Sequence, residues 1–232
     1  MESHQSWEFR CVCPDFAPLF SNIYLHVVLD RWFVEMVKPC LAGPAFLIRY
    51  ADDAVIVCKR EEDAKRIMSV LPKRFEKYGL RIHPEKTKLV DFRIPKTGDR
   101  KGNGSFTFLG FKHFWMKSRK KKWVVGRKTD GKRFARALSE ISKWCRLNRH
   151  EPVGEQHQTL SLKLRGYYGY YGITFNFQAL VRFFRCVQRI WLKWLNRRSN
   201  KDNFTWKRFQ DFMVSRPLPL PRIVHSSCIA KP

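Results

Sequence analysis

Two adjacent carboxylates interrupt a strand-like apolar run in the first quarter of the chain. The run extends from Ala45 to Cys58, and Ala51, Asp52 and Asp53 form a short break at its centre. Two β-rich halves around such a break predict a hairpin with the acids at its tip. Burying these charges would be costly unless a cation neutralised them, and Mg²⁺, which prefers oxygen ligands, is the natural candidate. An ordinary surface turn, in which aspartate is common, is the alternative.

The chain is strongly basic and rich in aromatic residues. Among its 232 residues, 46 are Lys or Arg and 20 are Asp or Glu, so the formal net charge is +26, and the excess runs through most of the chain. At 15% aromatic residues, the chain has too many core-forming side chains for a disordered basic tail. The composition therefore predicts a folded protein that binds a nucleic acid, through counterion release and base stacking. Charge that serves only solubility is the alternative.

The seven cysteines give no sign of a disulfide framework or a zinc site. They are scattered, odd in number, and contain no CxxC pair or Cys/His cluster with zinc spacing. Reduced thiols and a cytoplasmic location are therefore expected. The sequence also has no 18-residue apolar stretch, so we expect no membrane association.

The first part of the chain alternates helix and strand patterns. Apolar residues at helical spacing predict one helix over about 19–37 and another that begins near Glu61. Pro72 should kink or split the second helix, and Gly79 should cap its end. Short strands are expected at 80–83 and 89–92, with a strand pair or strand–turn at 106–111.

Helical periods dominate after about Gly131. Apolar stripes predict helices near 134–145, 160–164, 180–195 and 204–214. The predicted fold class is therefore α+β, with an α+β part at about 16–118 and an all-helical basic part at about 127–215. Residues 1–15 are expected to form an irregular lead-in. Residues 216–232 are expected to form a tail, where the prolines at 217, 219 and 221 end the ordered structure.

Several segments resemble motifs of one family in the same order along the chain. Tyr50-Ala51-Asp52-Asp53 resembles the Tyr-x-Asp-Asp hairpin of reverse transcriptases, and the helical segments 18–25 and 29–33 look like the helix that precedes it. Residues 79–88 are similar to the following palm motif, and 108–111 (Phe-Leu-Gly-Phe) to the primer-grip hairpin. Residues 164–172 and 219–225 look like the thumb and C-terminal segments of bacterial group II intron-encoded proteins.

The chain is thus identified as similar to group II intron reverse transcriptase/maturases over about residues 14–226. The resemblance implies the C-terminal part of a polymerase palm, an antiparallel sheet with packed helices, followed by a helical thumb. It implies RNA-directed DNA polymerase chemistry with Mg²⁺, intron RNA and an RNA/DNA hybrid as partners, and assistance of splicing. By resemblance Asp52 is the more direct metal ligand, Asp53 the second, and Lys86 lies near the incoming triphosphate. A solvated loop lysine is an equal alternative for Lys86.

The sequence departs from the family pattern before the hairpin. These polymerases also use a carboxylate from a strand well upstream. The only upstream aspartates are Asp15, in the irregular lead-in, and Asp30, in the preceding helix, and we expect neither to replace that ligand. The nucleotide-pocket loop is shortened to residues 14–18 and lacks its glycines. We therefore expect an N-terminally truncated enzyme that is inactive alone as a polymerase, holds Mg²⁺ weakly, and would need a complementing N-terminal fragment. A non-enzymatic RNA-binding maturase-like module and a degenerate remnant are the alternatives.

Nucleic-acid contacts are expected from both parts of the chain. The apolar residues of the primer-grip segment are explained equally well by core packing, and about half of the tyrosines at 167–171 should be core because they cannot all point one way. The cationic stretch at 117–122 is a candidate for phosphate contacts. The predicted contact residues are Tyr50, Phe108, Leu109, Gly110, Lys117, Arg119, Lys120, Lys121, Lys122, Arg165, Tyr167, Tyr168, Arg182, Arg185 and Arg189.

Overall fold

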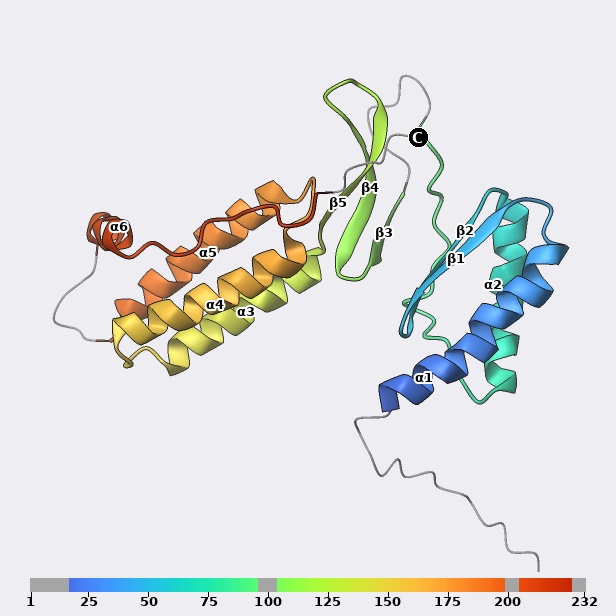
Figure 1. Ribbon diagram of the computed structural model, residues 1–232, viewed down its shortest axis with the longest axis horizontal. Coiled ribbons are helices and arrows are strands. Elements are labelled where there is room, and N and C mark those ends of the chain that lie inside the picture. The colour runs from blue at the N-terminus through green and yellow to red at the C-terminus, as the bar shows by residue number, and fades with distance from the viewer. Residues whose placement is uncertain (1–16, 96–103, 199–204, 227–232) are drawn as a thin grey trace, which may run out of the picture. The chain divides into compact units, whose positions relative to one another are not determined.

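The computed structural model describes residues 17–95, 104–198 and 205–226 (Figure 1). The expected lead-in at 1–15, with Asp15, lies outside these ranges, as does the last part of the expected tail. Tertiary contacts divide the chain into two units, residues 1–90 and 91–232. The fold class is α+β, as predicted, with small antiparallel sheets and helices α1–α6.

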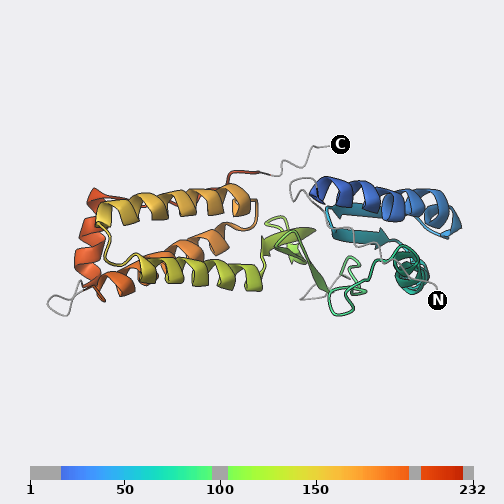
Figure 2. The same ribbon diagram turned by 90° about the horizontal axis from the view of Figure 1, so that it is seen from below.

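The first unit packs helices against a two-stranded hairpin. Helix α1 (Ala17–Leu25) continues through π-helical segments at His26–Arg31 and Phe33–Val37 and a 3₁₀ turn at Lys38–Cys40, which confirms the helix predicted over 19–37. Strands β1 (Ala45–Tyr50) and β2 (Asp53–Cys58) pair antiparallel. Figure 2 shows α1 lying along this hairpin.

Side-chain alternation gives the hairpin one packed face and one open face, because successive residues of a strand point to opposite sides. Ala45, Leu47, Ile56 and Cys58 pack with Phe33 and with Ile67 of helix α2 (Glu61–Lys77). The opposite face is mostly apolar, and its exposed apolar residues are Phe46, Ile48, Tyr50 and Val57.

Helix α2 passes through its internal proline without splitting. Of the two outcomes predicted at Pro72, the split does not occur, because the missing N–H removes a single hydrogen bond from a helix of 17 residues, and the kink stays a prediction. The predicted cap at Gly79 is confirmed. Gly79 has φ 68°, and the amides of Gly79 and Leu80 donate to the carbonyls of Glu76 (3.0 Å) and Phe75 (2.9 Å).

The strands predicted at 80–83 and 89–92 are not formed. Residues 80–95 contain a turn at 84–86 and otherwise irregular backbone. Alternating side chains make a strand only where a neighbouring strand accepts its hydrogen bonds, and the described residues offer none here. Phe92 is fixed instead by its carbonyl, which accepts a hydrogen bond from Trp115 Nε1 at 3.1 Å.

The second unit begins with a three-stranded antiparallel sheet. Strands β3 (Ser105–Phe108) and β4 (Phe111–Lys117) confirm the strand pair predicted at 106–111. Their two-residue turn, Leu109-Gly110, has positive φ at both positions (50° and 75°), as tight hairpin turns require. Strand β5 (Trp123–Thr129) was not predicted, because its apolar start leads into a mixed cationic sequence without clear alternation.

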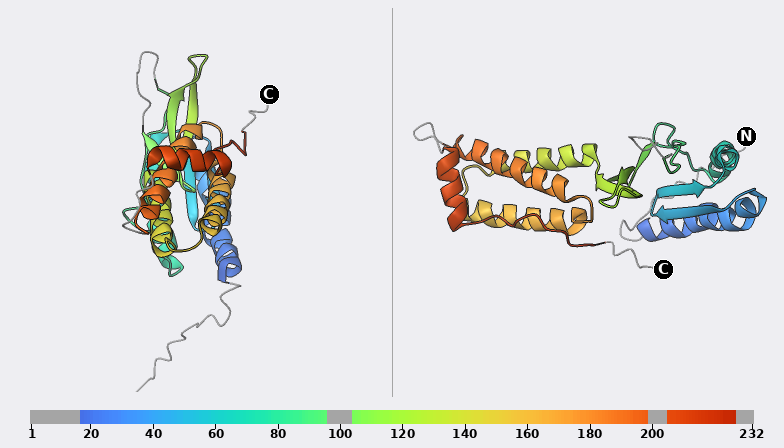
Figure 3. Two further views of the ribbon diagram at one scale, coloured as in Figure 1. Left: turned by 90° about the vertical axis from the view of Figure 1, so that its left-hand side faces the viewer. Right: turned by 90° about the horizontal axis from the view of Figure 1, so that it is seen from above.

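Four helices follow, one at each predicted apolar stripe, and the second extends well beyond the predicted 160–164 at both ends. They are α3 (Gly131–Leu147), α4 (Val153–Tyr171), α5 (Phe177–Leu195) and α6 (Trp206–Ser215). Asp130 caps α3 by accepting hydrogen bonds from the amides of Lys132 and Arg133. Figure 3 shows α3, α4 and α5 running side by side, with α6 crossing one end of this bundle.

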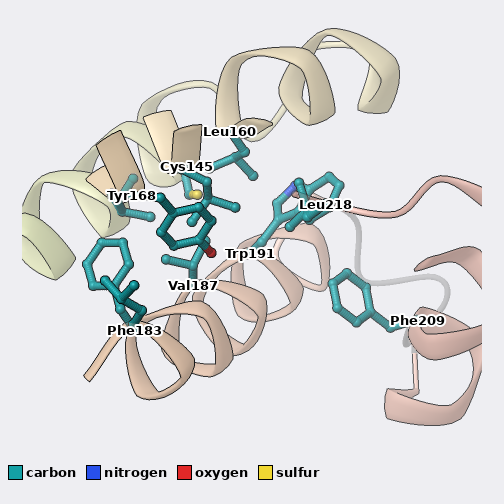
Figure 4. Close-up of a cluster of buried hydrophobic side chains, with 11 residues drawn as sticks. Cys145, Leu160, Tyr168, Phe183, Val187, Trp191, Phe209 and Leu218 are labelled. Carbon is teal, nitrogen blue, oxygen red and sulfur yellow. The ribbon is translucent and has the colours of Figure 1, made fainter. Parts of the chain in front are cut away.

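The bundle core is a cluster of large buried side chains (Figure 4). Trp191 is fully buried, and its indole N–H donates to Gln156 Oε1 at 2.9 Å, so its one polar group has a partner. The other buried members of the cluster are Ile141, Cys145, Leu160, Leu164, Tyr168, Leu180, Phe183, Val187, Phe209 and Leu218.

The first part of the expected tail belongs to this core. The prediction that the prolines end the ordered structure is wrong, because Leu218 between them is 1% exposed and lies in the bundle core. The chain then runs along the bundle (Figure 1), and the amides of Val224 and His225 donate to the carbonyl of Gly172 at 2.7 and 2.9 Å. A Cβ at Gly172 would collide with the carbonyl oxygens of Tyr168 and Arg222, so glycine permits this close approach.

Candidate metal and nucleic-acid site

The carboxylate pair lies at the tip of the first hairpin, as predicted. Tyr50 pairs with Asp53 at the end of the ladder, so Ala51 and Asp52 form the two-residue turn. Both acids are exposed. Their charges are therefore solvated, and the burial penalty that would have demanded a cation does not arise here.

Arg49 braces the turn that carries Asp52. Its guanidinium donates to the carbonyl of Ala51 at 2.8 Å, to Asn22 Oδ1 at 2.9 Å, and to both carboxylate oxygens of Asp30 at 2.8 Å each. Ala51 has φ 51°, a left-handed conformation that costs a residue with a Cβ about 1–2 kcal/mol. The planar fork of arginine matches this arrangement, so the acid turn is tied to the preceding helix.

Asp30 is ionised and engaged in this brace. Its hydrogen bonds from Arg49, and secondarily its interaction with His26, hold the pKa of Asp30 below its usual value despite partial burial. The expectation that Asp30 does not replace the family's upstream metal ligand agrees with this role. Sequence reasoning missed the partnership, because nothing in the spacing of Asp30 and Arg49 indicates that they meet.

A second missed carboxylate fixes the loop that leads into the hairpin. Asp63 is 1% exposed, and it accepts hydrogen bonds from the amides of Ala42 (3.2 Å) and Gly43 (3.0 Å). Its position in the first turn of α2 suggested only a favourable interaction with the helix dipole. In the fold it also anchors the start of β1.

The acid turn supplies only part of a metal centre. Across residues 17–95, 104–198 and 205–226, no group of three or more His, Cys, Asp or Glu side chains could hold an ion. Asp52 and Asp53 nevertheless supply hard oxygen donors, and Mg²⁺ in nucleotide-processing sites is often bound by one or two carboxylates together with phosphates and water. The pair therefore fits part of a Mg²⁺ site. Lys86 is exposed on the turn at 84–86, and its role near a triphosphate stays a prediction.

The basic charge is concentrated in the second unit, which makes up more than half of the chain. Residues 91–232 contain 32 of the 46 Lys and Arg but only 8 of the 20 Asp and Glu. Residues 1–90 contain 14 basic and 12 acidic side chains and are almost neutral. A polyanion is therefore attracted mainly to the second unit.

Two exposed basic features stand out in that unit. The turn between β4 and β5 presents Arg119, Lys120, Lys121 and Lys122, and Lys117 lies over the ring of Trp123 at 5.1 Å. On α5, Arg182, Arg185 and Arg189 are exposed at helical spacing and so share one face, whereas Arg165 is exposed on α4. These predicted phosphate contacts are all accessible.

Two of the aromatic residues that were predicted to contact nucleic acid are packed inside the bundle. Tyr168 is 1% exposed and belongs to the bundle core, and Tyr167 is stacked on Phe183 with ring centroids 3.7 Å apart. Burial raises the pKa of both hydroxyls. The prediction that Tyr167 and Tyr168 contact nucleic acid is therefore wrong for this conformation, because packing occupies their ring faces.

Tyr170 is the exposed tyrosine of the segment, and it contacts the primer-grip turn. Its side chain is 53% exposed, its hydroxyl donates to the carbonyl of Leu109 at 2.9 Å, and its ring is stacked on Phe111. Phe108, Leu109 and Gly110 are half-buried in this contact region. The turn is thus fixed to the end of α4, which the sequence did not indicate.

Comparison with known families gives a match to the segment that contains the acid turn. Residues 15–113 match the family model described as reverse transcriptase (RNA-dependent DNA polymerase). The match supports the reverse transcriptase family, whose members bind nucleic acid and use divalent metal ions. No curated protein matches the chain. In the described ranges, no helix is long and apolar enough to cross a bilayer.

Proposed function

We propose that the chain is the C-terminal palm and thumb portion of a bacterial group II intron reverse transcriptase/maturase, with intron RNA and an RNA/DNA hybrid as partners. One observation carries the RNA-binding part of this proposal. The unit that follows the acid hairpin holds 32 basic and 8 acidic residues, with clusters exposed on the β4–β5 turn and on α5. Such clusters bind phosphate backbones through counterion release. A cytoplasmic location follows from these partners.

The same proposal assigns the first unit to an incomplete polymerase palm. Asp52 would be the more direct Mg²⁺ ligand and Asp53 the second, and Lys86 would face a triphosphate. Bound Mg²⁺ would supply charge neutralisation at the phosphates. With only two carboxylates at the turn, the isolated chain should not polymerise DNA.

A separate N-terminal fragment is the proposed source of the missing carboxylate. In the part of the first unit that the structure describes, β2 pairs only with β1, so its outer edge is open to another strand. The apolar face with Phe46 and Ile48 is also exposed there. Exposed edges and apolar faces of this kind are usually covered in a complete domain.

RNA affinity tests the binding role. Anisotropy with a labelled RNA, measured from low to high salt, should show an affinity that falls steeply with salt. The slope of the logarithm of the binding constant against the logarithm of the salt concentration is the salt slope. Changing the four basic residues at 119–122 to glutamine should reduce its magnitude by about 0.7–0.9 for each phosphate that is no longer neutralised. Four exposed cations on α2 serve as the matched control and should leave the slope unchanged: Lys65, Arg66, Lys73 and Lys77.

Primer extension tests the palm assignment. The isolated chain, given an RNA template, a DNA primer and Mg²⁺, should incorporate no nucleotide, and Asp52→Ala should leave its RNA affinity unchanged. Template-dependent synthesis by the chain alone would overturn the assignment of an incomplete site. Absence of salt-sensitive RNA binding would favour a degenerate remnant instead.

A further inference from the structure

The turn between α4 and α5 exposes two aromatic rings that the proposed contacts do not include. Phe175 is 45% exposed and Phe177 is 48% exposed. Phe175 also has φ 72°, a left-handed conformation that is rare for a bulky residue. A strained and exposed phenylalanine is costly to keep in place, and such strain is often found where a protein binds a partner.

A buried asparagine between the rings fixes the turn. Asn176 is 1% exposed, and its side-chain amide donates to Thr129 Oγ1 at 2.9 Å and to the Tyr171 carbonyl at 2.8 Å. Its Oδ1 accepts from the Thr129 amide at 2.9 Å. Because all three hydrogen bonds lie inside the second unit, the backbone that carries the two flanking rings is fixed before any partner binds.

Charge decides which partner fits this surface. Residues 91–232 carry 32 basic and 8 acidic side chains, so a second copy of the unit is repelled and a polyanion is attracted. Arg185 is exposed and follows Phe177 on α5 by eight positions, about 12 Å along the helix axis and about 80° around it. A phosphate of a strand whose bases reach the rings is therefore within range of the Arg185 guanidinium.

We infer that Phe175 and Phe177 form a stacking site for unpaired bases of a single-stranded nucleic acid. Every base has a face that can stack on an aromatic ring, so the site would be tolerant of sequence. Bases inside a duplex are already stacked on each other, so the site selects single strands over duplexes. The inference rests on the proposed RNA-binding function and names which form of RNA the second unit prefers.

Ring-removing substitutions in the full chain test the site. Phe175→Gly removes a ring and also relieves the left-handed conformation, so it should fold at least as well as the parent chain. Phe177→Leu keeps an apolar side chain without the ring. Each should weaken binding of a labelled 12-nucleotide oligouridine at least fivefold, the low end of base–ring stacking, and should leave the salt slope unchanged. Phe177→Trp should retain the affinity.

Two controls separate this inference from the proposed function. Trp206→Leu removes another exposed ring of the same unit, on α6, and should not change oligouridine affinity. A 12-base-pair RNA duplex should bind the Phe175 and Phe177 variants as well as it binds the parent chain.

If the parent chain binds neither RNA, the proposed function fails. If it binds both with a steep salt slope and the variants bind oligouridine normally, only the stacking site fails. A change in sedimentation mass without a change in RNA affinity would show instead that the rings contact a second copy.

Discussion

The brace between Arg49 and Asp30 should determine the stability of the acid hairpin. The side chains of Arg49 and Asp30 are 14% and 25% exposed, and two hydrogen bonds of 2.8 Å join them. Breaking a fully buried ion pair costs about 3–5 kcal/mol, and exposed pairs are worth about 0–1 kcal/mol. For this partly exposed pair, which also holds the Ala51 carbonyl, we expect Arg49→Gln to destabilise the hairpin by about 2–3 kcal/mol.

Amide hydrogen exchange is the appropriate assay, because the chain has two units and a global unfolding midpoint would mix them. A loss of 2–3 kcal/mol should accelerate exchange of residues 45–58 by about 30- to 150-fold. Arg31→Gln is the matched control. It breaks an i,i+4 pair with Glu35 whose side chains are 57% and 55% exposed, so exchange should change less than about threefold.

The pH dependence provides an independent check on the same pair. Because the folded-state pKa of Asp30 is lowered, its contribution to stability is complete above its usual value of 3.8 and is lost as the pH falls through the folded value. The difference in hairpin protection between the parent chain and Asp30→Asn should therefore disappear in acid. Additive effects of Arg49→Gln and Asp30→Asn, with a coupling energy below about 0.5 kcal/mol, would show that the ion pair between these side chains does not stabilise the hairpin.

Three further outcomes are expected in the second unit. Gly172→Ala should release the segment after α6, measured as faster exchange at 217–226, whereas Gly166→Ala, where a Cβ meets nothing within 4 Å, should leave it protected. Leu218→Ala should lower the unit's free energy of unfolding by about 2–4 kcal/mol, measured by amide hydrogen exchange of α4 and α5, because this side chain is 1% exposed. His113 is stacked on Phe106, and desolvation lowers the pKa of its imidazole. The stability of the second unit should therefore fall as the pH drops below about 6.5, the usual pKa of histidine. His113→Phe should remove that pH dependence.

Local sequence patterns were sufficient to predict those elements whose structure depends on nearby residues alone. The hairpin at 45–58, the glycine cap at Gly79 and the helices after Gly131 all follow from periodicity and turn chemistry within a few residues. The strands at 80–83 and 89–92 failed because a strand depends on a partner that the same segment does not specify. The missed strand β5 shows the converse, since β4 supplies the partner for a segment with weak alternation.

Contacts between residues distant in the sequence could not be predicted, for the same reason. Arg49 meets Asp30 across 19 positions, and Asn176 meets Thr129 across 47. Nothing in either segment alone states the partner. The tyrosines at 167–171 show a partial success, because helical spacing predicts that they diverge. Only the packing shows that Tyr168 is buried and Tyr170 is exposed.

The separation of charge between the units is consistent with the two proposed tasks. A carboxylate pair attracts a divalent cation best when few positive side chains surround it, and residues 1–90 carry nearly equal numbers of basic and acidic residues. An RNA-binding surface has the opposite requirement, which residues 91–232 meet with a fourfold excess of basic side chains. A complementing fragment that covered the open face at Phe46 and Ile48 would therefore not need to neutralise the RNA-binding unit. Its proposed task is limited to the hairpin, where one further carboxylate would join Asp52 and Asp53.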